Sequence, residues 1–347
     1  MKITHNIFGT EPLCDENDFC DGKIYTICTA CTSIYSEFLS WANEHKDRMI
    51  KNPEKANNII VLGCQVTDLA ILNDIKTIEK LMSKYPDKKF FMGGCLAQRM
   101  DIPLPLGVNR LAGVRSDYQP LDDMSLIEYA KPFWVKNFKE SEEPSLYDEK
   151  IKDGHLFRHE YPIRIGAGCK GKCTYCSIRH TRGVAYELDI NKLKEQFEDH
   201  DSVVLIADNP TVDQLKARIN EAYDHCSTQI SIRNVEPATA LAVWDDLIKI
   251  AGKQLKVFHC PIQSDRIETL QAMKRPVEAT MHFISKAWEL QKYNVICATN
   301  VIVDYLDYPN PTDNVYKLFD YVSWNPYWNG KWNREQAEQR FKKYFGH

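Results

Sequence analysis

Apolar and amphipathic stretches alternate along the chain from about residue 154 onward. Six apolar runs of strand length are separated by segments in which apolar residues recur every three or four positions. This alternation is typical of parallel strands joined by crossover helices, and six such units fit a partial (β/α) barrel. The predicted strands are Tyr161 to Ile165, Ser202 to Ala207, Gln229 to Asn234, Leu255 to Ile262, Asn294 to Asp304 and Tyr321 to Trp324, with helices at Val212 to His225, Ala238 to Ile250 and Thr280 to Tyr293.

The first 150 residues predict a separate α/β unit. A charged stretch from residue 140 to 154 is typical of a linker, and one further helix is predicted near the end of the chain, at 333–344. We therefore expect three parts, at residues 1–150, 155–328 and 329–347. Within the first part, strands are predicted at 23–27, 58–62, 88–92 and 110–114, and helices at 33–48 and 67–83.

Composition limits the class of protein. The 347 residues are 44% hydrophobic and 27% charged, as in globular proteins, and no run approaches the roughly 18 apolar residues that span a membrane. No secretory signal is recognisable at the N-terminus, so we expect a cytoplasmic protein. Its net charge of −4 does not favour a nucleic-acid partner. In that reducing compartment the 12 cysteines are expected to bind metal or clusters rather than form disulfides.

Three closely spaced cysteines, Cys169, Cys173 and Cys176, follow the first predicted barrel strand. Thiolates are the ligands that iron-sulfur clusters select, and three of them leave one iron of a 4Fe-4S cluster open to a small chelating molecule. A loop at the carboxyl end of a parallel strand is where such folds do chemistry. Zinc is the alternative: it usually takes four Cys or His ligands, and His180 could be the fourth.

A second set of cysteines shares one position relative to the predicted strands of the first part. Cys64 and Cys95 each follow a strand and a glycine, and Cys28 or Cys31 ends the first strand. The carboxyl ends of adjacent parallel strands face one crevice, so three thiols can converge there on a second cluster. Three buried core cysteines are the alternative. Cys226, Cys260 and Cys297 lack convergent spacing and are interpreted as packing residues.

These motifs resemble a known enzyme family. The C-x3-C-x-aromatic-C loop is similar to that of the radical S-adenosylmethionine (SAM) superfamily. The segments Leu62-Gly-Cys64-Gln-Val-Thr67 and Gly93-Gly-Cys95-Leu-Ala-Gln-Arg99, followed by that loop and Arg182-Gly183, resemble radical SAM methylthiotransferases in the same order. His259-Cys-Pro-Ile-Gln-Ser264 resembles the family's P-L-Q-S-G-S signature. The resemblance covers roughly residues 23 to 340 and includes Leu270, Met273 and Arg275, which match an L-x-x-M-x-R pattern, and the closing strand at 319–327.

The resemblance implies an α/β fold in which a doubly wound N-terminal domain precedes a partial (β/α)6 radical SAM barrel. It also implies two 4Fe-4S clusters. Cys169, Cys173 and Cys176 would hold the cluster that binds and cleaves SAM. Cys64 and Cys95 would hold an auxiliary cluster together with Cys31, which an ungapped fit of strand and helix favours, or with Cys28, which the spacing to Cys64 favours.

The predicted SAM contacts lie in the cysteine loop and at strand ends of the barrel. Tyr175 matches the aromatic residue that packs near the adenine in the family. Arg233 could bind the carboxylate of SAM or pair with Glu236, and the residues at 263 and 264 could contact SAM or simply end a strand. The full predicted set is Tyr175, Arg233, Gln263, Ser264 and Asp208.

Sulfur insertion is the activity that the resemblance implies. A 5'-deoxyadenosyl radical from SAM would abstract hydrogen from an unactivated carbon of a peptide, protein or RNA, and the auxiliary cluster would deliver a methylthio or thio group. A reducing partner such as flavodoxin or ferredoxin is implied. The alternatives are another C-H modification that uses the auxiliary cluster for electron transfer, and a non-enzymatic electron carrier.

The sequence departs from the family at four places. Asp265-Arg266 stand where the family has Gly-Ser, Gly63 replaces a threonine, and the segment 302–309 replaces a Gly-Phe-Pro-Gly-Glu turn. Family members usually append a small β-barrel domain that contacts tRNA or a ribosomal protein, and this sequence ends without it. That difference and the acidic balance favour a peptide or protein substrate slightly over tRNA.

Overall fold

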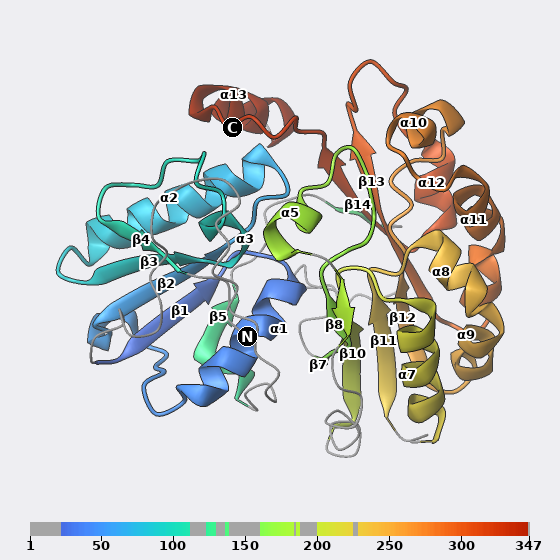
Figure 1. Ribbon diagram of the computed structural model, residues 1–347, viewed down its shortest axis with the longest axis horizontal. Coiled ribbons are helices and arrows are strands. Elements are labelled where there is room, and N and C mark those ends of the chain that lie inside the picture. Colours follow the sequence, from blue (N-terminus) through green and yellow to red (C-terminus); the bar gives the residue numbers. More distant parts are fainter. Residues whose placement is uncertain are drawn as a thin grey trace. The chain divides into compact units, whose positions relative to one another are not determined.

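A computed structural model describes residues 22–111, 123–129, 136–138, 160–183, 185–187, 200–224 and 228–345. The chain divides into two compact units (Figure 1). The first comprises residues 1–132 and 328–347, and the second comprises residues 133–327. Cys14, Cys20, Cys226 and the predicted linker at 140–154 lie outside the described residues.

A five-stranded parallel sheet forms the centre of the first unit. Its strand order is β4-β3-β2-β1-β5. The three central strands are apolar and buried on both faces, as expected of a parallel sheet between helices. Of the last predicted strand, at 110–114, residue 110 lies in β4, and residues 112–114 lie outside the described residues. The strands are β1 (Ile24–Cys28), β2 (Asn58–Gly63), β3 (Lys89–Gly93), β4 (Val108–Arg110) and β5 (Ile127–Tyr129).

Helices α1 (Thr32–Glu44) and α2 (Asp68–Lys84) lie on opposite faces of this sheet (Figure 1). The side chain of Thr67 caps α2 by accepting a hydrogen bond from the backbone N–H of Ala70, at 3.1 Å. The short helix α3 (Gly94–Ala97) follows β3 directly. The last helix of the chain, α13 (Arg334–Phe345), also belongs to this unit and packs on α2.

A seven-stranded sheet forms the second unit. Six strands are parallel and follow one another in chain order, which is the order of a partial (β/α)6 barrel, and β6 (Lys136–Phe138) pairs antiparallel with the last of them. All six predicted strands are confirmed. They are β7 (Tyr161–Arg164), β10 (Ser202–Ile206), β11 (Gln229–Arg233), β12 (Leu255–His259), β13 (Ile296–Val303) and β14 (Tyr321–Pro326).

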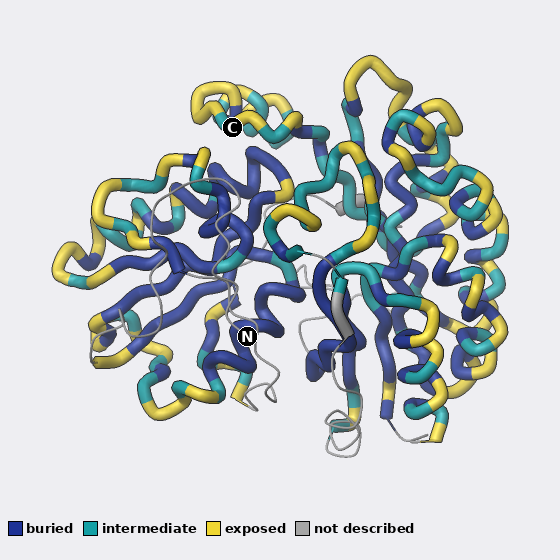
Figure 2. The backbone as a smooth tube through the Cα atoms, viewed as in Figure 1, coloured by how far each residue is buried: buried dark blue, intermediate teal, exposed yellow. Residues whose placement is uncertain are grey.

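Helices α7, α8, α9, α11 and α12 pack apolar side chains against these strands, most of which are buried along most of their length (Figure 2). The predicted helix at 238–250 is interrupted at Val243, and a new helix starts with Asp245 and Asp246 in its first turn, where acidic residues are favoured. No described helix has the length and apolar character to span a membrane. The helices are α5 (Ile178–Arg182), α7 (Val212–Asp224), α8 (Pro237–Ala242), α9 (Trp244–Ala251), α10 (Ile267–Ala272), α11 (Val277–Gln291) and α12 (Asp313–Leu318).

Candidate functional site

The loop with Cys169, Cys173 and Cys176 lies between β8 (Gly166–Ala167) and α5, in the second unit. Asp208, just beyond the end of β10, ties the two ends of this loop together. Its Oδ2 accepts hydrogen bonds from the backbone N–H of Gly168, at 2.8 Å, and from Nε of Arg182, at 2.6 Å. Both charged side chains are less than a tenth exposed. Asp208 therefore fixes the path of the cysteine loop.

Gly171 leaves space between two of the thiols. Its backbone N–H donates to Sγ of Cys169, at 3.1 Å, and a Cβ at this position would lie 3.1 Å from Sγ of Cys169 and 3.9 Å from Sγ of Cys173. Any larger residue would fill the space that both thiols face. Within the described ranges, no three His, Cys, Asp or Glu side chains are arranged around a single-ion position.

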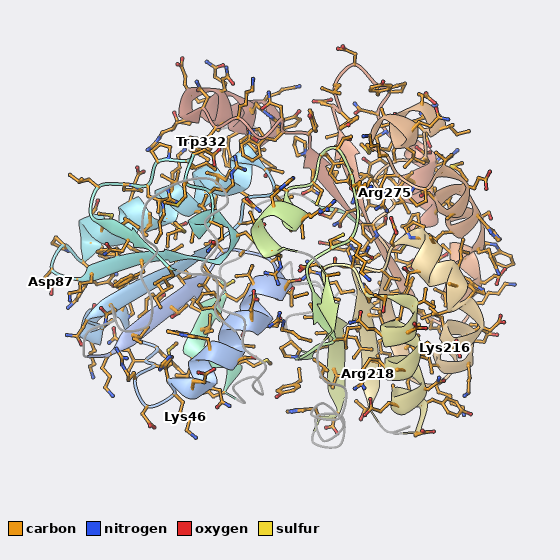
Figure 3. All side chains as sticks on the ribbon, viewed as in Figure 1. Lys46, Asp87, Lys216, Arg218, Arg275 and Trp332 are labelled. Atoms are coloured by element: carbon orange, nitrogen blue, oxygen red, sulfur yellow. The ribbon has the colours of Figure 1, made fainter. Side chains whose placement is uncertain are left out.

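Polar and cationic side chains reach the same thiols. Nδ2 of Asn209 lies 3.8 Å from Sγ of Cys169, and Nη1 of Arg275 lies 3.9 Å from Sγ of Cys173. Arg275, labelled in Figure 3, also donates to Oε1 of Glu236 at 3.2 Å. Hydrogen bonds and a nearby positive charge stabilise the negative charge of a thiolate-bound iron-sulfur cluster.

Burial controls the protonation of these thiols. It raises the pKa of Cys176 to about 12 and also raises the pKa of Cys169. Both thiols are therefore neutral at pH 7 before iron binds, and binding must displace their protons. With the donors from Asn209 and Arg275 and the space beside Gly171, this set of residues fits a 4Fe-4S cluster.

The second cysteine group lies at the carboxyl ends of β1, β2 and β3 in the first unit. Cys31 is the N-cap residue of α1, Cys64 follows β2, and Cys95 lies in α3. The thiol of Cys64 interacts electrostatically with those of Cys31 and Cys95, and burial raises its pKa first, with these neighbours adding to the rise. Cys28 is the fully buried last residue of β1. This arrangement favours Cys31 over Cys28 as the third member of the group.

Two glycines let the second and third of these cysteine segments approach each other. Gly63 and Gly94 form a parallel bridge, and a Cβ on Gly94, whose φ is +72°, would lie 2.7 Å from the carbonyl oxygen of Gly63. A Cβ on Gly63 would lie 2.9 Å from Oδ2 of Asp74, so the threonine usual in the family does not fit here. That Oδ2 accepts from the backbone N–H of Cys64 at 2.6 Å, and burial raises the pKa of Asp74 to about 8.

Curated relatives match about half of this chain. The ribosomal protein uS12 methylthiotransferase RimO of Desulfitobacterium hafniense strain Y51 is 26% identical in an alignment of 168 residues that covers 46% of this chain and 38% of the relative. The protein of that name from Clostridium botulinum strain Langeland is 30% identical in an alignment of 183 residues that covers 46% of this chain and 37% of the relative. The one from Clostridium acetobutylicum is 28% identical in an alignment of 201 residues that covers 51% of this chain and 41% of the relative.

Over about half of its length, the chain is similar to these methylthiotransferases. It spans about 40% of the length of the curated relatives that it matches. No family model matches it. Solved structures of the cobalamin-dependent S-adenosylmethionine radical enzyme OxsB align with 81% of this chain at a TM-score of 0.44 and 10% identity, and with 86% of it at 0.45 and 9%.

Three of the residues predicted to contact SAM have neighbours of different kinds in the structure. Tyr175 packs in a cluster with Met273 and Tyr305 and lies beside Cys173. Ser264 is fully buried, and its Oγ accepts from the backbone N–H of Arg266 at 3.1 Å, which shapes the turn before α10. Asp208 binds the cysteine loop itself. Their roles toward SAM stay predictions.

The other two predicted contacts lie at the ends of β11 and β12. The backbone of Gln263 has a φ of +70° and bridges to Val301 of β13. The guanidinium of Arg233 lies close enough to His259 to lower its pKa. Glu236, the alternative partner considered for Arg233, is bound by Arg275.

The sequence alone did not assign a role to Asp74 or to the Arg275–Glu236 pair beside Cys173. Asp74 could have been found as a carboxylate that stands between Ile71 and Ile75 on the apolar face of α2. Arg275 was recognised only as part of a motif. Its contact with Cys173 joins residues 102 positions apart, which no local pattern reveals.

His259 gives a prediction for stability against pH. Burial first, and Arg233 second, lower the pKa of His259 to about 3, whereas an unfolded histidine titrates near 6.5. Between these values the unfolded chain binds the extra proton, so stability falls as the pH drops from about 7 toward 3, by up to about 1.4 kcal/mol per pH unit. His259→Gln should flatten this dependence in urea titrations, while the exposed His282→Gln should not. If the free energy of unfolding of His259→Gln depends on pH as steeply as that of the wild type, His259 is not the group responsible.

The Arg275–Glu236 pair gives a prediction for the cluster at Cys173. Reduction adds negative charge, which Arg275 stabilises, so Arg275→Gln should lower the midpoint potential by roughly 60 mV, a tenfold change for one electron. Glu236→Gln removes a negative charge at the same place and should raise the potential. Potentiometric titration followed by electron paramagnetic resonance (EPR) measures both. Shifts of the same sign in the two variants would exclude an electrostatic role for the pair.

Proposed function

We propose that the chain is a radical SAM enzyme of the methylthiotransferase type that inserts a methylthio or thio group at an unactivated C-H bond of a peptide or protein. The observation that carries this proposal is that two groups of three cysteines lie in separate units, one in the loop between β8 and α5 and the other at the carboxyl ends of β1, β2 and β3. A single group would be enough for SAM cleavage alone.

The matched relatives support the chemistry and the class of substrate. Their name states methylthiotransfer to ribosomal protein uS12, which is a protein substrate. A net charge of −4 is also more compatible with a peptide or protein than with tRNA. The reducing partner would be a flavodoxin or ferredoxin, because SAM cleavage requires one electron.

When bound, one cluster would supply the electron that splits SAM into methionine and a 5'-deoxyadenosyl radical, which takes the substrate hydrogen. The other would supply the sulfur, and a second SAM would supply the methyl group of a methylthio product. The chain's own residues do the rest. Cys169, Cys173 and Cys176 would hold the first cluster, while Asp208 fixes their loop. Arg233, Tyr175, Gln263 and Ser264 would contact SAM.

Mass spectrometry of cells with and without this protein tests the proposal. We expect a methylthio group on one peptide only in cells that carry the wild-type chain, and its loss with the Cys64→Ala variant. A modification found only on tRNA nucleosides would overturn the substrate class. A C-H modification without sulfur that persists in the variant would overturn the sulfur-inserting role.

A further inference from the structure

The chain returns to the first unit after its last barrel strand, and the returning segment is built into that unit's core. Trp328 is only 9% exposed and packs in the same hydrophobic cluster as Leu96 and Ala97, the two residues that follow Cys95 in α3. Trp332, labelled in Figure 3, packs against the same cluster. The helix that carries Cys95 is thus covered by residues more than 230 positions later in the chain.

Arg99 joins this returning segment to the Cys95 helix. It lies four residues after Cys95, and its side chain is 6% exposed. Its Nη2 donates to the carbonyl oxygen of Gly330 at 2.7 Å, and its guanidinium lies 5.2 Å from the ring centroid of Trp328. A bidentate pair with Asp101 fixes the guanidinium. Arg99 therefore has no freedom to leave the returning segment without losing a charge-assisted hydrogen bond and a cation–π contact.

Helix α13 makes a second connection, to the segment that follows Cys64. Nη1 of Arg340 lies 3.2 Å from Oδ2 of Asp68, the buried first residue of α2 and four positions after Cys64. Further along α2, Arg334 binds both carboxylate oxygens of Glu79, at 2.6 and 2.9 Å. Removing the arginine that pairs with a buried carboxylate costs more than removing one partner of an exposed surface pair, because the carboxylate is left buried without its counter-charge.

We propose that the segment 328–345 is a positioning element for the second cysteine group. It holds α3, and with it Cys95, through Trp328 and Arg99, and it holds the start of α2, next to Cys64, through Arg340. A helix of four residues has little stability of its own and depends on tertiary contacts. The inference rests on the proposed function, since it assumes that this group binds an iron-sulfur cluster.

The test uses the full-length chain with Cys169, Cys173 and Cys176 all changed to alanine, so that only the second group can bind iron. Anaerobic reconstitution of this background should give about four irons per chain. Trp328→Ala in the same background should release iron to a chelator about tenfold faster and change the EPR spectrum of the cluster. Trp328→Phe keeps a ring under Arg99 and should restore both. Trp288→Ala is the control. It also removes a tryptophan that contacts a cationic side chain, Lys292, but Trp288 is exposed and lies on α11 in the second unit.

If Trp328→Ala releases iron at the same rate and has the same EPR spectrum as the triple-alanine chain, the positioning role is refuted. The auxiliary cluster itself would not be contradicted by that result. A background that binds no iron would remove the auxiliary cluster, and both proposals with it. If circular dichroism shows that Trp328→Ala does not fold, Arg340→Gln decides, because Arg340 is partly exposed and its loss leaves the core intact. Faster release in Arg340→Gln supports the proposal, and an unchanged rate overturns it.

Discussion

Cys173→Ala is expected to abolish the release of 5'-deoxyadenosine from SAM under reducing conditions. Sγ of Cys173 lies beside the space at Gly171 and is the thiol that Arg275 approaches. Three thiolates hold three irons of a 4Fe-4S cluster and leave the fourth open to SAM, and we expect two thiolates to be too few to retain the cluster. The loss should therefore be complete rather than partial, and it should remove about four irons per chain.

The control for this variant is Cys297→Ala, which removes a thiol from the hydrophobic core of the same unit without touching the loop. It should keep both iron and SAM cleavage. Liquid chromatography of the nucleoside product, together with iron analysis, measures both effects. Unchanged release of 5'-deoxyadenosine by Cys173→Ala would refute the assignment of this loop.

Cys64→Ala is expected to separate the two halves of the reaction. SAM cleavage should persist, because Cys169, Cys173 and Cys176 remain intact, whereas transfer of sulfur to the substrate should be lost. The physical reason is that Cys64 is buried and interacts with both Cys31 and Cys95, so its removal leaves too few thiolates for the auxiliary cluster. Sulfur transfer by this variant would exclude the auxiliary role of the group.

Cys31→Ala and Cys28→Ala form the matched pair for this prediction. Cys31→Ala should behave like Cys64→Ala, and Cys28→Ala should keep sulfur transfer, because Cys28 is a strand residue buried beneath the group. The opposite result would assign Cys28 as the third ligand.

The longer parallel strands could be predicted because they are short apolar runs, most of which are buried on both faces. Strands of two or three residues could not, and the structure adds β8, β9 (Tyr186–Glu187), β5 and β6. The predicted helix at 238–250 merged two helices, since both have apolar stripes and only the backbone at Val243 separates them.

The cysteines of both groups could be placed from the sequence because each follows a strand. What holds the loops could not be foreseen. Asp208 was predicted as a SAM contact from its position at a strand end, and its hydrogen bonds to Gly168 and Arg182 depend on how β8 and α5 fold back over β10. The packing of α13 on α2 depends likewise on where the chain returns after β14.

The iron content of the anaerobically reconstituted wild-type chain, measured with Mössbauer spectroscopy to identify the cluster type, tests the account most directly. Two 4Fe-4S clusters predict about eight irons per chain, all in 4Fe-4S form. About four irons in a fully occupied sample, lost entirely in Cys173→Ala, would contradict the second cluster and with it the sulfur-inserting function.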